Sequence, residues 1–198
     1  MASNNERAVR IEKLERIRAL GINPYPRGFQ KNQTIWELVL QWEQDKWKLR
    51  DIEQIVEDPQ NLYQTAGRLM LNRSFGKLFF GKLKDAYGEI QVAASKQSCR
   101  ILDASGEAVE ELPGSSEPVS AFKFLEKLID RGDFIWVQGE LFYTHKGELT
   151  LFITNFSLLS KAIQPLPEKF HGMEDPELRY RKRYVDMITN DEVFDVIS

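Results

Sequence analysis

The sequence predicts a mainly β fold with flanking helices, in which five strands form a Greek-key barrel of the OB-fold type. Three observations lead to this prediction. The period of the apolar residues changes from helical to alternating near Leu62. Five strand-like segments follow, with one short amphipathic helix between the third and the fourth. This element order is typical of the OB-fold, a small barrel that often binds oligonucleotides.

Two helical segments are expected before the barrel. Residues 6–20 carry apolar side chains at helical spacing and end at Gly21, and we expect their charged faces to be solvated. A second helix is expected from Thr34, because Thr34 and Glu37 fit a capping box. This segment could continue, with breaks, towards Val56.

Short connecting segments are expected to separate the barrel strands. We expect the strands at residues 62–73, 76–84, 88–94, 133–143 and 148–158, and the helix at 121–130. The segment between the third strand and this helix, residues 99–120, is rich in Ser, Glu, Pro and Gly. We therefore expect it to form an exposed excursion that begins at Cys99.

The predicted elements divide the chain into three parts. Residues 1–60 form an N-terminal helical extension, and residues 61–161 form the OB-fold domain. Residues 162–198 are expected to hold a linker stiffened by prolines and the truncated start of another domain, whose first helix opens at Asp175.

Composition and charge exclude several classes of protein. The 198 residues are 42% hydrophobic and 29% charged, which is typical of a soluble globular protein. A formal net charge of -3 argues against a protein that coats nucleic acid over its whole surface, but it allows a local basic patch. With one cysteine, no signal-peptide core and no apolar run of about 18 residues, a reducing, cytoplasmic location without membrane contact is expected.

One segment of this acidic chain is purely basic. Residues 66–84 include five Lys or Arg and no acidic residue. Within the second predicted strand, Phe80, Lys82 and Lys84 share one side, because alternate side chains of a strand face opposite ways. Burying unpaired lysines in a small barrel is too costly, so this side is expected to be the outer face.

The same alternation extends the outer face to other strands. Leu71 is expected to point inward, whereas Arg73 breaks the alternation and could lie past the strand end or at a bulge. The outer face is then expected to present Arg68, Asn72, Phe80, Lys82, Lys84 and Gln91, with Glu148 at its rim.

An exposed aromatic ring among cations suits single-stranded nucleic acid. The Phe80 ring can stack on a base while the lysines hold phosphates. The Gln91 amide and the Glu148 carboxylate can read a base edge, because the amide both donates and accepts whereas the carboxylate only accepts. The alternative left open is that the N-terminal helices cover Phe80 and that the lysines are an ordinary solvated edge.

Several segments resemble class II lysyl-tRNA synthetases of the bacterial type. TAGRLMLNRSFGKLFFGKLKDAYGEIQ resembles their anticodon-binding strands, and RIRALGINPYP resembles their N-terminal helix and turn. PLPEKFHG followed by ELRYRKRYVDM is the more specific signature of the lysyl enzymes. The resemblance covers nearly the whole chain except residues 97–119, where this sequence is longer than expected.

The resemblance implies roles for individual residues of the barrel. Phe80 matches the phenylalanine that stacks on an anticodon base, and Arg73, Gln91 and Glu148 match residues that contact anticodon bases. Arg68 matches a neighbouring arginine. Together with the expected phosphate contacts of Lys82 and Lys84, these residues form the predicted site.

The resemblance also implies an activity for the full-length protein. Such an enzyme is a homodimer that activates lysine with ATP, assisted by Mg²⁺, and transfers it to tRNA(Lys), whose anticodon loop is the expected partner here. This chain shows neither the second nor the third class II motif. We therefore expect no catalytic residue, metal ligand or cofactor site in it, and no activity from it alone. Two alternatives are an aspartyl- or asparaginyl-type anticodon domain and a stand-alone OB-fold module for single-stranded nucleic acid.

Overall fold

The computed structural model describes residues 2–27, 33–45, 50–103, 105–109, 112 and 119–166 of the chain. Residues 1–163 form one compact unit, and residues 164–198 form a second, of which only the first three are described. The helix predicted to open at Asp175 lies outside the described residues. The boundaries predicted after residues 60 and 161 stay predictions.

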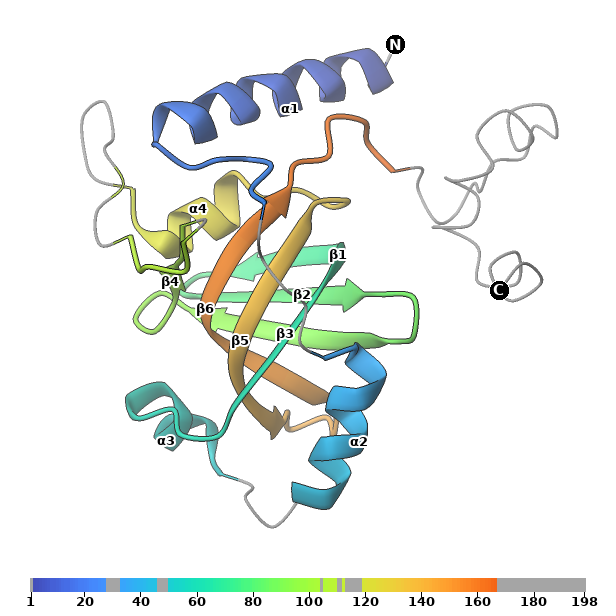
Figure 1. Ribbon diagram of the computed structural model, residues 1–198, viewed down its shortest axis with the longest axis vertical. Coiled ribbons are helices and arrows are strands. Elements are labelled where there is room, and N and C mark those ends of the chain that lie inside the picture. The colour runs from blue at the N-terminus through green and yellow to red at the C-terminus, as the bar shows by residue number, and fades with distance from the viewer. Residues whose placement is uncertain are drawn as a thin grey trace, which may run out of the picture. The chain divides into compact units, whose positions relative to one another are not determined.

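Five strands close into a barrel, as the sequence predicts (Figure 1). They are β1 (Leu62–Phe75), β2 (Leu78–Lys84), β3 (Glu89–Ser95), β5 (Phe134–Tyr143) and β6 (Leu149–Ser160). Neighbouring strands are antiparallel in the order β3-β2-β1-β5-β6, and a parallel pairing of β3 with β6 closes the circle. With α4 between the third and fourth barrel strands, this is the OB-fold topology.

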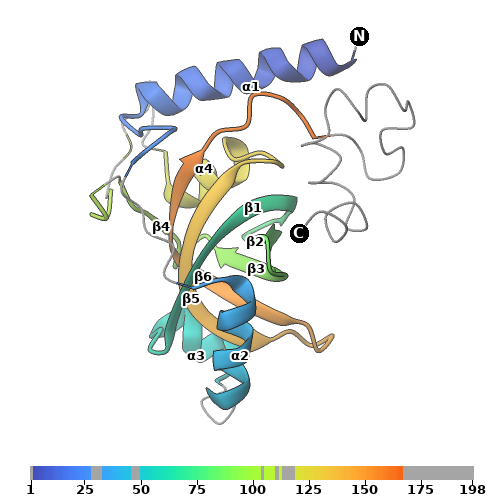
Figure 2. The same ribbon diagram turned by 45° about the vertical axis from the view of Figure 1, so that its right-hand side comes forward.

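In the described residues, four helices flank the barrel: α1 (Ala2–Ala19), α2 (Ile35–Asp45), α3 (Ile52–Glu57) and α4 (Ala121–Lys127). Figures 1 and 2 show α4 and α2 at opposite ends of the barrel. The capping box of α2 is confirmed, because the Thr34 amide donates to Glu37 Oε2 at 2.8 Å and the Glu37 amide donates to Thr34 Oγ1 at 3.1 Å. No helix in the described part of the chain has the length and apolar character that spanning a lipid bilayer requires.

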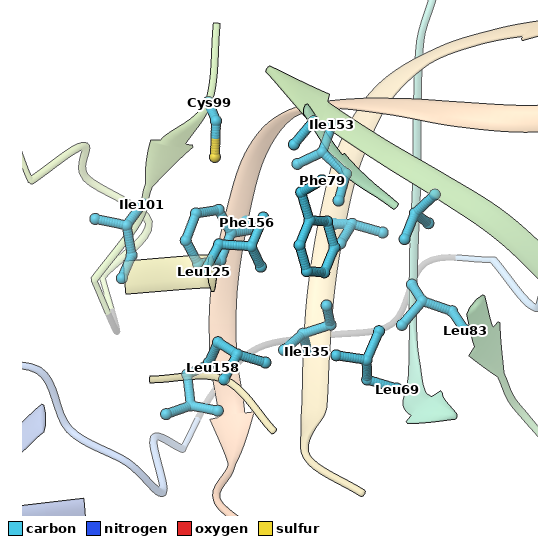
Figure 3. Close-up of a cluster of buried hydrophobic side chains, with 14 of the residues drawn as sticks. Leu69, Phe79, Leu83, Cys99, Ile101, Leu125, Ile135, Ile153, Phe156 and Leu158 are labelled. Carbon is cyan, nitrogen blue, oxygen red and sulfur yellow. The ribbon is translucent and has the colours of Figure 1, made fainter. Parts of the chain in front are cut away.

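The inward side chains of the barrel pack into one continuous core. Figure 3 shows Leu69, Phe79 and Leu83 gathered with side chains from β5 and β6. Cys99 belongs to the same core, because it directly precedes a short strand, β4 (Arg100–Ile101), that pairs with β6. The prediction that Cys99 begins an exposed excursion is therefore wrong, and burial raises the pKa of its thiol to about 12.

A glycine allows β5 and β6 to cross closely. The register between these strands shifts at Gly139. A Cβ atom at this position would overlap the carbonyl oxygen of Phe152. Only a residue without a side chain fits there, and the resulting bulge bends the pair as a closed barrel requires.

Most charged residues of α1 are exposed, as expected, but Arg10 and Lys13 bind the rest of the fold instead. Arg10 is buried and donates through Nη1 to the carbonyl oxygens of Arg131, at 2.9 Å, and Ala162, at 3.1 Å. Lys13 pairs with Asp130 at 2.5 Å. The chain leaving β6 is thus held by α1 through specific polar contacts.

Lys161, just after β6, lies in the same group of charges. Its Nζ atom is 2.6 Å from Asp130 and 2.9 Å from Asp133. We call Lys13, Lys161, Asp130 and Asp133 the buried ion cluster. Burial alone would raise the pKa of Asp130, but hydrogen bonds from Lys13 and Lys161 outweigh it and hold that pKa below its ordinary value.

Candidate nucleic-acid interface

A bulge in β1 decides which side chains reach the outer face of the barrel. The register with β2 shifts between Leu69 and Leu71. Leu69 still points into the core, but Leu71 opposes Lys82 on the outer face and is 42% exposed, so its predicted inward placement is wrong. Asn72, predicted outward, is turned the other way, and its amide nitrogen donates to the carbonyl oxygen of Ile129 at 3.4 Å.

The same bulge brings Arg73 to the outer face. Arg73 directly opposes Phe80 in the β1–β2 register, and residues that oppose each other in an antiparallel pair share a face. Of the two explanations considered from the sequence, the bulge is the one the structure supports. Arg73 is exposed and forms no ion pair with another residue that the structure describes.

Phe80 is half-buried rather than fully open to solvent. It packs on a second apolar cluster, outside the barrel, that includes Ile55 of α3 and Phe152 of β6. The alternative that the N-terminal helices cover Phe80 is therefore partly correct, since α3 supports the ring without enclosing it. A ring held in this way loses little further freedom when a base stacks on it.

Gln91 is held on the outer face by a hydrogen bond. It opposes Lys82 of β2 and Thr150 of β6. Its Nε2 atom donates to Thr150 Oγ1 at 2.8 Å. This bond orients the amide and leaves the Gln91 carbonyl oxygen as an acceptor for a ligand.

Glu148 lies at the rim of the face, as predicted, in the turn between β5 and β6. Its amide donates to Thr144 Oγ1 at 3.2 Å, and its carbonyl oxygen accepts from the Thr144 amide at 3.1 Å. Thr150 Oγ1 also donates to the Glu148 carbonyl oxygen, at 3.1 Å. The backbone of Glu148 is thus fixed next to the partner of Gln91, while its carboxylate is exposed.

The lysines of β2 are not simply exposed cations. Lys82 Nζ lies 2.5 Å from Glu89 Oε1 of β3, so a phosphate at Lys82 would have to compete with this carboxylate. Lys84 is half-buried and opposes Arg68 and Glu89 in the neighbouring strands. The sequence had suggested that both lysines are unpaired cations, and the structure does not support this for either.

Arg68 already binds other residues of the barrel domain. Its guanidinium lies 4.3 Å from the centre of the Phe134 ring, and Nη1 donates to the carbonyl oxygen of Gly132 at 3.0 Å. Burial lowers its pKa, against the opposing effect of the Asp133 carboxylate. Arg68 therefore holds the start of β5, and it opposes Lys84 at the far end of β2 from Phe80.

The outer face also carries residues that sequence reasoning missed. Phe75 and Leu78 oppose each other at the hairpin end of β1 and β2 and are exposed. The sequence predicted that the first strand ends at Arg73 and left Phe75 between two strands, whereas β1 extends to Phe75. The described residues contain no group of three or more His, Cys, Asp or Glu that could hold a metal ion.

Comparison with known protein families indicates the class of domain to which the barrel is similar. Residues 63–159 match the family model described as "OB-fold nucleic acid binding domain". This range begins and ends within one residue of the first and last barrel strands. The match therefore covers the closed barrel and leaves the preceding helices outside it.

The relatives then specify the kind of protein. The chain is 39% identical to a lysine–tRNA ligase of Carboxydothermus hydrogenoformans over 93% of its length, and 40% identical to one of Streptococcus suis over 97%. It is 37% identical to lysine–tRNA ligase 2 of Methanosarcina mazei over 92%. It spans about a third of each relative, 31%, 34% and 30% respectively. The chain is a homologue of the N-terminal region of lysine–tRNA ligases, which confirms the predicted resemblance and supports it over the two alternatives.

Proposed function

We propose that the outer face of β1, β2 and β3 binds the anticodon loop of a lysine tRNA as part of a lysine–tRNA ligase. The observation that carries this proposal is the strand register. Arg73 opposes Phe80, and Lys82 opposes Gln91, so three strands bring the predicted base-contacting side chains together on one face. The ligase relatives support the same assignment.

Each side chain offers a different contact to an unpaired base. The Phe80 ring, backed by the α3 cluster, offers a stacking surface. Arg73 can donate to base carbonyl oxygens, and the Glu148 carboxylate can accept from a ring N–H. The Gln91 carbonyl oxygen is a further acceptor beside its bond to Thr150. This mixture suits uracil, which has two carbonyl oxygens and one N–H, and a lysine anticodon is rich in uridine.

For the whole protein, we propose the reaction of its relatives. Lysine would be activated with ATP and Mg²⁺ and transferred to tRNA(Lys) by a cytoplasmic homodimer. The described residues include no group of three or more acidic, His or Cys side chains that could hold a metal ion. The role of the described barrel is to bind and select the tRNA.

The test measures binding of the chain to an RNA stem-loop that presents a uridine-rich anticodon. Phe80→Ala is expected to weaken binding by on the order of 1–3 kcal/mol, the usual contribution of one stacked base. Phe80→Leu is the sharper variant, because it keeps apolar contact with the α3 cluster while removing the aromatic face.

The control is the same stem-loop with cytidines in place of the loop uridines, which should bind more weakly to the parent chain. Unchanged affinity of both Phe80 variants, combined with equal binding of the two loops, would refute the proposed function. A thermal unfolding measurement on each variant shows that the barrel is intact.

A further inference from the structure

Phe75 is a second aromatic residue on the proposed interface. It is the last residue of β1 and opposes Leu78, so it lies on the same face as Arg73 and Phe80. It is 63% exposed, although a phenylalanine ring gains most when it is removed from water. Its place in the fold does not explain this exposure, because Phe75 is not a member of either apolar cluster.

The Phe75 and Phe80 rings are neighbours that do not stack on each other. Their centroids are 6.5 Å apart and their planes are inclined at 63°, an edge-to-face arrangement. Phe80 is backed by the α3 cluster, whereas most of the Phe75 ring faces water. Leu71 and Leu78, each 42% exposed, extend the apolar surface. Several exposed apolar groups on one face are more typical of a binding surface than a single one.

Unpaired cations surround this end of the face. Lys77 lies in the turn that joins β1 to β2, and the Lys96 amide donates to its carbonyl oxygen at 3.0 Å. Lys77, Lys96 and Arg73 are exposed, and none forms an ion pair with another described residue. Lys82, farther along the same face, is already paired with Glu89. The end of the face with the free aromatic ring therefore also has the free positive charge.

We propose that Phe75 is a second stacking platform, which binds the nucleotide next to the one on Phe80, and that Lys77 and Lys96 bind its phosphate. This inference rests on the proposed function and extends it, since the ligand becomes at least two successive unpaired nucleotides. RNA-binding sheets with two exposed aromatic rings commonly stack two or three bases in this way. The cations beside Phe75 supply the counter-charge that each added phosphate needs.

The experiment uses the whole chain and the uridine-rich stem-loop RNA. Phe75→Ala is expected to weaken binding about tenfold, with little change in the thermal unfolding midpoint because the ring is mostly exposed. The matched control is Trp36→Ala, which removes an aromatic ring that is 57% exposed. Trp36 lies beside Gly88, past the other end of β2, so this variant should bind RNA like the parent.

A second set of RNAs locates the contact. Each carries one abasic nucleotide on one side or the other of the nucleotide that Phe80 stacks on. The parent should bind one of these RNAs about tenfold more weakly than the intact stem-loop. The Phe75→Ala variant should bind this RNA and the intact stem-loop with equal affinity, because the variant and the abasic nucleotide remove the same interaction.

The outcomes separate the two proposals. If Phe80→Leu weakens binding while Phe75→Ala does not, or if the abasic losses are equal in parent and variant, the second platform is overturned and the proposed function stands. If neither phenylalanine variant weakens binding and the parent binds the uridine and cytidine loops equally, both proposals fail.

Discussion

The buried ion cluster and the outer face use the same residue types for different purposes. In the cluster, the Lys161 side chain has no exposed surface, and its Nζ atom lies within 3 Å of both Asp130 and Asp133. On the outer face, Arg73, Lys77 and Lys96 are exposed and unpaired among the described residues. A buried charge is tolerated only with a partner of opposite charge, whereas an exposed cation is solvated by water and stays available to a ligand. The surroundings of a lysine therefore decide whether it stabilises the fold or stays available to a ligand.

The largest expected effect comes from breaking the buried ion cluster. Lys161→Ala leaves the fully buried Asp133 without its cation, and the free energy of unfolding should fall by about 3–5 kcal/mol. Chemical denaturation measures this loss, and the matched Lys77→Ala variant on the outer face should lose less than about 0.5 kcal/mol. Equal losses for the two variants would contradict the distinction between the regions.

A smaller effect is expected from Asp130, at the edge of the cluster. Asp130→Asn removes the charge that Lys13 and Lys161 bind, and should cost about 2 kcal/mol at neutral pH. The pKa of Asp130 is lowered in the folded protein, so the carboxylate stabilises the fold above its unfolded pKa, near 4.

This stabilisation should disappear as the pH falls through the lowered, folded-state pKa of Asp130. Denaturant titrations of the parent and the Asp130→Asn variant at a series of acidic pH values measure it. The two stabilities should converge towards low pH, and a constant difference between them down to that pH would contradict the assignment.

The sequence predicted the barrel well because its signal is local. Alternation along β2 identified Phe80 and Lys82 as outward, and Phe79 and Leu83 as core, and the structure agrees. The same rule failed after the β1 bulge, where Leu71 and Asn72 exchange sides. An inserted residue moves every later side chain of the strand to the opposite face of the sheet. No residue type near the bulge indicates from the sequence that it occurs there.

Contacts between segments far apart in the chain could not be predicted from the sequence either. The ion pair of Lys161 with Asp133 joins residues 28 positions apart, and nothing near Lys161 in the sequence indicates its burial. The Lys82–Glu89 pair depends on the β2–β3 register, so the sequence could not show that Lys82 is already neutralised. Cys99 is buried for the same kind of reason, because β4 adds to β6 after an irregular segment.

The smallest expected effect distinguishes two lysines of the outer face. Lys77→Ala removes an unpaired cation and should flatten the log–log dependence of RNA affinity on salt by about 0.7, the value for one phosphate contact with a single strand. Lys82→Ala should change this slope by less, because Glu89 already neutralises the Lys82 ammonium group. Binding titrations at several salt concentrations measure both slopes.

Glu89→Gln tests the reason for this difference. Removing the carboxylate releases Lys82 for a phosphate, so the variant should bind the stem-loop more tightly at low salt, with a slope steeper by up to about 0.7. In the Glu89→Gln background, Lys82→Ala should then cost as much as Lys77→Ala does in the parent. If Lys82→Ala instead has the same effect with and without Glu89, the ion pair does not restrain Lys82, and the unpaired cations would not be confined to the Phe75 end of the face.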